Sequence, residues 1–131
     1  MSPELMALTT LVALQILFGI STSLIVGSRA GIGYLFSSRE DEGVDLTSGF
    51  VGRMHRARTN NFEAMAYFTP TVAVVELAGT NSETTAAAAW VFVTARIGFI
   101  LCYAFDLTPW RTLVWYVGTI AVATMLIASV S

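Results

Sequence analysis

The residues with the clearest chemical potential lie between Gly52 and Glu63, at the start of a long apolar segment. At the α-helical repeat of about 100° per residue, four side chains of this stretch fall within a sector of about 80°. These four side chains, which we call the polar stripe, are those of Arg53, Arg56, Asn60 and Glu63. A guanidinium group presents a planar fork of donors that matches a carboxylate. The stripe therefore predicts a binding site for a molecule that carries carboxylates.

A simpler interpretation is that the arginines only mark the cytoplasmic end of a membrane helix, as basic residues often do. This interpretation accounts for Arg53, Arg56 and Arg58. It does not account for Asn60 and Glu63, which lie one to two turns deeper on the same face. A polar stripe inside a bilayer costs several kcal/mol unless it faces protein, water or a ligand. We therefore favour a binding site over a plain topology signal.

The composition of the chain is that of an integral membrane protein. Of its 131 residues, 55% are hydrophobic and 12% are charged, whereas soluble domains average about 25% charged residues. The apolar residues form four blocks, each close to the roughly 20 residues that span a bilayer as a helix. We therefore predict one all-α domain, residues 1–131, built as a bundle of four transmembrane helices. The predicted spans are at about residues 5–26, 52–78, 84–105 and 109–128.

The arginines indicate how this bundle lies in the membrane. Most of them are in or beside the loop at residues 28–52, and Arg111 flanks the loop between the third and fourth spans. Cytoplasmic loops are enriched in arginine and lysine. We therefore expect these two loops to face the cytoplasm and both termini to face the opposite side. In a bacterium the membrane would be the cell inner membrane.

Two rare residue types limit other kinds of chemistry. The chain has one cysteine, Cys102, and one histidine, His55. An intrachain disulfide is therefore excluded, and a metal site within one chain is not expected. We interpret Cys102 as a buried small apolar residue and place His55 off the polar stripe. We also expect no nucleic-acid partner.

The polar stripe follows a recognisable pattern, R-x-x-R-A-x-x-N-x-x-E at residues 53–63. This pattern resembles that of the membrane-associated proteins in eicosanoid and glutathione metabolism (MAPEG), which include the microsomal glutathione transferases. The resemblance extends over about half of the chain, from Gly52 to Gly118, in the same order and topology. Its other matching residues are Ala95-Arg96, Tyr103 and Pro109-x-Arg111.

The resemblance implies a homotrimer of four-helix subunits that binds glutathione between neighbouring protomers near the cytoplasmic face. It implies glutathione transferase or peroxidase activity on lipophilic electrophiles, which would enter from the lipid bilayer. Arg53 and Arg56 would meet the glutathione carboxylates or brace the pocket. Asn60 and Glu63 would hold the polar backbone and amino group of glutathione.

The remaining matching residues lie outside the stripe. By the resemblance, Arg96 and Tyr103 would contribute from the partner side, and Arg111 would stand beside the thiol. The nucleophile in this chemistry is the thiolate, whereas a free thiol has a pKa of about 8.5. An adjacent guanidinium favours the thiolate anion and so lowers this pKa. Arg29 closes the first span, and we expect it to turn back towards the stripe.

The chain also departs from the family pattern. Some relatives in the family have a tyrosine one turn after the arginine of the fourth span, and some have another just after the stripe glutamate. This chain has Trp115 and Ala64 there. An aromatic hydroxyl at the thiol would then come from Tyr103 or Tyr116.

Two other function classes remain open at this stage. A non-catalytic membrane protein can retain the fold as an interaction or accessory subunit. A small channel or transporter is disfavoured, because the first and fourth spans carry no charge beyond Arg111. Glutathione binding would separate the catalytic interpretation from the non-catalytic one.

Overall fold

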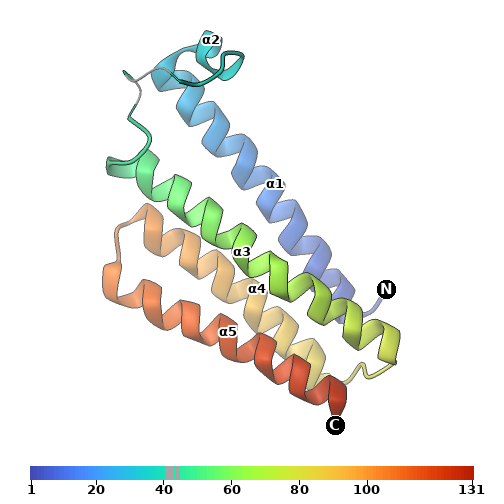
Figure 1. The fold of residues 1–131 in the computed structure, drawn as a ribbon. Helices are drawn as coiled ribbons and strands as arrows, with labels where there is room; N and C mark the ends of the chain where they lie inside the picture. The colour runs from blue at the N-terminus through green and yellow to red at the C-terminus, as the bar shows by residue number, and fades with distance from the viewer. Residues whose placement is uncertain (41–42, 44) are drawn as a thin grey trace.

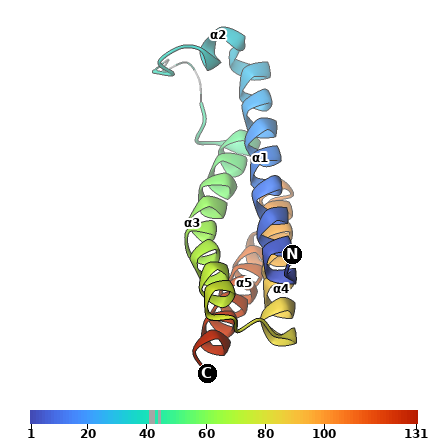
Figure 2. The same ribbon diagram turned by 90° about the vertical axis from the view of Figure 1, so that its right-hand side faces the viewer.

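The computed structural model describes residues 1–40, 43 and 45–131, and these residues fold into α-helices joined by turns and loops. Four long helices run antiparallel to their neighbours along the chain, and one short helix follows the first of them (Figures 1 and 2). The helices are α1 (Pro3–Ala30), α2 (Ile32–Leu35), α3 (Gly49–Ala78), α4 (Glu83–Ala104) and α5 (Thr108–Val130). Each predicted span therefore corresponds to one long helix, and the all-α prediction is confirmed for the described residues.

Three of the long helices, α1, α4 and α5, are long and apolar enough to cross a membrane. α3 has 30 residues but is not among them, because polar residues recur along it. A fourth span at α3 therefore stays a prediction. It requires the polar side chains of α3 to be satisfied by protein or by a ligand.

The ends of the helices follow from local side-chain chemistry. Ser2 caps α1 by accepting a hydrogen bond from the Leu5 backbone N–H at 3.1 Å. Ser82 and Thr85 form a reciprocal capping box at the start of α4, which satisfies N–H groups that a helix start leaves free. α3 ends at Ala78, and the next residue, Gly79, has a φ of 65°, in the left-handed region that favours glycine. These caps fix the start of α1, the end of α3 and the start of α4.

The main hydrophobic core lies in the half of the bundle that contains the chain termini. Phe68 of α3 stacks on Phe92 of α4 with ring centroids 4.3 Å apart, and Leu11 of α1 and Met125 of α5 are fully buried in the same cluster. A smaller cluster around Phe18 occupies the other half. Accordingly, α1 diverges from α3 towards the α2 end of the molecule (Figure 1).

A buried polar network ties the start of α1 to the turn between α3 and α4. Glu4 is fully buried and accepts hydrogen bonds from Thr85 Oγ1 and, at 3.1 Å, from Asn81 Nδ2. Glu76 accepts from the same Asn81 nitrogen at 2.8 Å and from Ser2 Oγ. Both termini and this turn lie at one end of the bundle, and α2 and the α4–α5 turn lie at the other (Figure 1).

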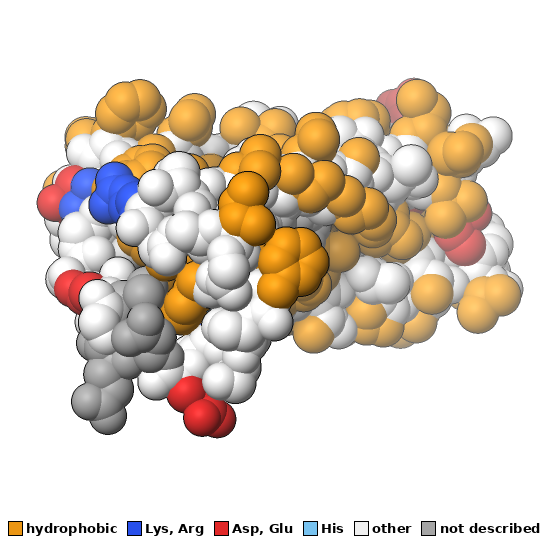
Figure 3. Space-filling model, turned by 90° about the horizontal axis from the view of Figure 1, so that it is seen from above, with side chains coloured by type: hydrophobic (Ala, Val, Ile, Leu, Met, Phe, Trp, Pro, Cys, Tyr) orange, Lys and Arg blue, Asp and Glu red, His pale blue; other side chains and the backbone are white. Residues whose placement is uncertain are grey.

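The outer surface of the bundle is largely apolar. Figure 3 shows hydrophobic side chains over much of the flank and charged side chains towards its two ends. Large exposed side chains include Leu24 at 67%, Ile120 at 63% and Ile127 at 66% exposure. A soluble monomer rarely exposes so much contiguous apolar surface. Together with the three helices of membrane length, this surface identifies a multi-pass integral membrane protein.

Candidate functional site

The loop that leads into α3, the helix that carries the polar stripe, is held in a turn by the Asp45 carboxylate. Asp45 accepts hydrogen bonds from the backbone N–H groups of Thr47 and Ser48 at 2.8 and 3.2 Å. Hydrogen bonds from the Ser48 hydroxyl and from Thr47 hold the pKa of the Asp45 carboxyl well below its usual range. A Cβ atom at Gly52 would collide with the Thr47 backbone, so glycine is needed there for the loop to close onto the helix.

The first half of α3 presents the stripe at its surface. Arg56 is exposed, and its Nη1 donates a hydrogen bond to the Thr47 carbonyl oxygen at 2.9 Å. Arg53 is half-buried, and its Nε donates to the Tyr103 carbonyl oxygen of α4 at 3.1 Å. Two carbonyl oxygens, one in the loop before α3 and one in α4, therefore orient the two arginines at the N-terminal end of the stripe.

Tyr103 brings three of the predicted site residues together. Its carbonyl oxygen accepts the hydrogen bond from Arg53, and its ring lies 4.7 Å from the guanidinium carbon of Arg111. The tight α4–α5 turn makes this possible, because the Leu107 N–H donates to the Cys102 carbonyl oxygen at 2.8 Å and reverses the chain. Side chains from α3, α4 and α5 thus meet at one end of the bundle.

Arg96 forms the second meeting point. It is 2% exposed, and its Nη2 and Nε donate hydrogen bonds of 2.9 Å to Asn60 Oδ1 and Asn61 Oδ1. Its guanidinium carbon also lies 4.3 Å from the Phe99 ring centroid. The buried charge in α4 therefore finds its partners within the chain, on α3.

Asn61 extends this contact to α1, because its Nδ2 donates a hydrogen bond to Gln15 Oε1. The side chains of Gln15, Asn61, Arg96 and Asn60 form one polar chain across α1, α3 and α4, which we call the buried polar chain. Sequence reasoning placed only two of these residues in the site. The available signal was that Gln15 is the only strongly polar side chain within the first apolar segment.

The buried polar chain determines what Asn60 can offer a ligand. Its Oδ1 is already an acceptor for Arg96, and an amide has two donor hydrogens on its nitrogen. Asn60 is half-buried, so its Nδ2 remains as a donor on the stripe side. Asn60 is thus suited to bind a carbonyl or carboxylate oxygen rather than an ammonium group.

Three predicted site residues are not joined to the others by the contacts of the described residues: Arg56, which donates to the Thr47 carbonyl oxygen, Glu63 and Arg29. Glu63 is exposed about halfway along α3, and no hydrogen bond or ion pair engages it within the part of the chain that the structure describes. Arg29 is exposed in the last turn of α1. Among the described residues, no hydrogen bond connects Arg29 to the stripe.

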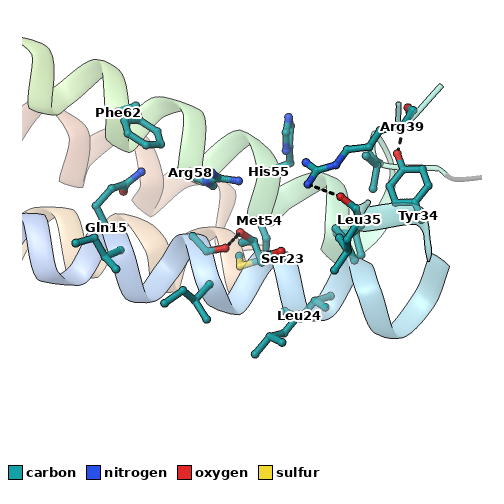
Figure 4. A pocket seen from close by; sticks show the side chains of 18 of the residues that line it. Gln15, Ser23, Leu24, Tyr34, Leu35, Arg39, Met54, His55, Arg58 and Phe62 are labelled. Atoms are coloured by element: carbon teal, nitrogen blue, oxygen red, sulfur yellow. Dashed lines mark hydrogen bonds between the residues drawn. The ribbon is translucent and has the colours of Figure 1, made fainter. Parts of the chain in front are cut away.

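The other titratable residues of this stretch face a different direction. Arg58 and His55 line a cavity between α1 and α3, away from the stripe (Figure 4). Cys102 is buried, as its interpretation as a small apolar core residue requires. The described part of the chain therefore has the polar stripe on one face of α3 and a cavity on the other.

Residues 5–131 of the chain match the MAPEG family. The match covers nearly the whole sequence, so the chain belongs to the MAPEG family. No match was found among curated proteins or among solved structures.

Proposed function

We propose that this MAPEG family member is a membrane-bound glutathione transferase or peroxidase that acts on lipophilic electrophiles. The observation that carries the proposal is that Arg53 and Arg111 both contact Tyr103. Arg53 donates a hydrogen bond to its carbonyl oxygen and Arg111 lies over its ring, so two guanidinium groups lie near the N-terminal end of the polar stripe. Glutathione is a co-substrate that has two carboxylates, one ammonium group and one thiol, and the stripe offers complementary groups for them.

In this proposal Arg111 is the catalytic residue. Its guanidinium stabilises the glutathione thiolate, and the thiolate sulfur forms a bond to the electrophilic carbon of the acceptor as the leaving group departs. The Tyr103 ring holds the guanidinium by a cation–π contact. The Tyr103 hydroxyl takes the place of the family tyrosines that are replaced here by Ala64 and Trp115.

The polar stripe binds the rest of glutathione. Arg53 and Arg56 pair with carboxylates, the Asn60 Nδ2 donates to a carbonyl or carboxylate oxygen, and Glu63 accepts from the ammonium group. Arg96 acts through Asn60, because its side chain is buried and already engaged.

Asn60→Ala and Glu63→Gln are each expected to weaken glutathione binding by about 1–3 kcal/mol, because each change strands a polar partner in a desolvated site. Calorimetric titration of the detergent-purified protein measures this loss. Thr59→Ala is the matched control, since Thr59 is exposed on the same turn but lies outside the stripe. Affinity equal to that of the wild type in both stripe variants would refute the assignment of the stripe.

The functional unit in this proposal is a homotrimer. Glu63 is an exposed carboxylate halfway along a predicted membrane span and has no partner in the described chain. Such a group is costly in a bilayer unless a neighbouring protomer or a ligand faces it. Native mass spectrometry in several mild detergents should therefore detect a trimer. Detection of monomers and dimers alone would contradict the prediction.

The site faces the cytoplasm in this proposal, and both termini face the opposite side. Five of the seven arginines, all except Arg39 and Arg96, lie near the end of α1, the start of α3 or the start of α5. These three helix ends lie at the same end of the bundle as α2 (Figure 1), which supports this orientation. Cysteines introduced at Ser2 and Ser131 in a Cys102→Ala background should react with an impermeant thiol reagent from the non-cytoplasmic side. Labelling of both positions only from the cytoplasmic side would reverse the orientation and move the site to the other face.

A further inference from the structure

Tyr67 continues the polar stripe by one turn of α3. At 100° per residue it falls inside the sector of about 80° that the four stripe side chains occupy. It lies four residues after Glu63, and residues at this spacing face the same side of a helix with about 5–6 Å between their Cβ atoms. Side chains on a helix lean towards its N-terminus, so the Tyr67 ring leans back towards Glu63. Its hydroxyl therefore belongs to the C-terminal end of the stripe.

The Tyr67 ring is held in place by the hydrophobic core. It meets the Phe92 ring of α4 edge-on, with ring centroids 6.2 Å apart and planes at 68°. Phe92 is fully buried and stacks in turn on Phe68 of α3. A tyrosine side chain has only two rotatable angles, so these contacts leave the ring little freedom. Tyr67 is nevertheless 37% exposed, so it stays accessible to a ligand.

The hydroxyl of Tyr67 has no hydrogen-bond partner within the described residues. It lies near the middle of the predicted span at residues 52–78, whereas tyrosines of membrane proteins are enriched at the interfaces, where the hydroxyl reaches water. The Arg96 guanidinium of α4 interacts electrostatically with this phenol. A cation attracts the phenol oxygen, so the hydroxyl proton is directed away from Arg96. The hydroxyl is therefore a donor in search of an acceptor.

The covalent structure of glutathione requires a donor near Glu63. In the proposed function Glu63 binds the ammonium group, and the γ-glutamyl carboxylate is bonded to the same carbon as that ammonium group. This carboxylate must therefore bind within about one turn of Glu63. Arg53 and Arg56 are at least seven residues away, which is about 10 Å or more along the helix. Both donate to backbone oxygens at the N-terminal end of the stripe, where they are placed for the glycine carboxylate.

Two donors flank Glu63 on the stripe face. Asn60 precedes it by three residues, and its Nδ2 remains free for a ligand because its Oδ1 accepts from Arg96. Tyr67 follows it by four residues. A carboxylate has two oxygens that each accept hydrogen bonds, so one oxygen can face each donor. The spacing of the three side chains thus matches a carboxylate and an ammonium group on one carbon.

We propose that Tyr67 is a specificity-determining residue of the glutathione site, where its hydroxyl donates a hydrogen bond to the γ-glutamyl carboxylate beside Asn60 Nδ2. Glu63 binds the adjacent ammonium group, so this end of the stripe recognises an α-amino acid zwitterion. The inference rests on the proposed function, because it takes glutathione as the ligand. It adds that the site selects thiols with a γ-glutamyl group over thiols that lack its carboxylate.

The test is calorimetric titration of the detergent-purified full chain with two ligands. The second ligand, γ-aminobutyryl-cysteinylglycine, keeps the thiol, the ammonium group and the glycine carboxylate of glutathione but lacks the γ-glutamyl carboxylate. Tyr67→Phe should weaken glutathione binding by roughly tenfold or more, as expected for the loss of one hydrogen bond to a charged group. Binding of the second ligand should not change. Because only one oxygen atom is removed, the unfolding midpoint without ligand should stay at the wild-type value.

Tyr34→Phe is the matched control. It removes the same atom in α2, where the hydroxyl already donates to the Arg39 carbonyl oxygen, and it should bind both ligands as the wild type does. Unchanged glutathione affinity in Tyr67→Phe, or equal weakening of both ligands, would overturn the role of Tyr67. Either result leaves the proposed function standing as long as the wild type binds glutathione. A wild-type protein that does not bind glutathione would refute the proposed function and this inference together.

Discussion

Replacement of Arg111 by alanine is expected to raise the thiol pKa of bound glutathione towards the free value of about 8.5, while glutathione affinity stays largely intact. The guanidinium is held against the Tyr103 ring at the site mouth, beside the proposed position of the sulfur. A pKa lowered by one to two units corresponds to about 1.4–2.7 kcal/mol of preferential stabilisation of the thiolate. Loss of the guanidinium removes this stabilisation but none of the stripe contacts.

The measurement is a titration of the ultraviolet absorbance of the thiolate with purified protein, followed over pH. Thr112→Ala is a suitable control, because Thr112 is the exposed next residue in α5. Arg111→Lys should recover only part of the effect, since an ammonium group does not reproduce the planar guanidinium fork. A thiolate signal and turnover unchanged in Arg111→Ala would make Arg111 a topology marker. The chain would then be better interpreted as a non-catalytic member of its family.

Asn61→Leu is expected to destabilise the protein more than Arg96→Met does, although Asn61 is the neutral residue of the pair. Without Asn61, the buried Arg96 keeps its charge but loses the acceptor at its Nε, and the Gln15 side chain loses its only hydrogen bond to the described residues. Leaving a buried charge incompletely paired costs about 3–5 kcal/mol. Arg96→Met removes the charge together with the donors that Asn60 Oδ1 and Asn61 Oδ1 accept from. It leaves two neutral acceptors without a donor but no unpaired charge, so we expect a smaller cost of about 1–3 kcal/mol.

Thermal or denaturant unfolding in detergent micelles measures this order of stabilities. Asn61→Asp is the matched comparison, because the aspartate keeps an acceptor for Arg96 but removes the donor to Gln15 Oε1. Its stability should therefore lie between those of the wild type and Asn61→Leu. Glutathione binding provides a second readout, since Arg96 orients Asn60 and its loss should weaken binding as well. A smaller destabilisation in Asn61→Leu than in Arg96→Met would show that the buried polar chain does not hold these helices together.

Much of the fold could be predicted from local sequence features. The apolar blocks and the turn residues between them located four long helices, and each predicted span corresponds to one of them. The family assignment from the R-x-x-R-A-x-x-N-x-x-E pattern is confirmed by the match over residues 5–131. Both signals are local, because helical periodicity and motif spacing depend only on neighbours along the chain. The trimer, the orientation and the roles of the site residues stay predictions.

The sequence by itself determined that the chain is a helical membrane protein with a one-sided polar stripe. It also places Arg96 inside the third apolar block, where a charge requires a partner. Only the tertiary structure decided which partner. It paired Arg96 with Asn60 and Asn61 inside the protomer, and it gathered Arg53 and Arg111 at Tyr103. The physical reason is that periodicity fixes the angle of a side chain around its own helix but not the axial register between helices. That register is set by the packing of residues such as Phe68 on Phe92, which lie far apart in the sequence.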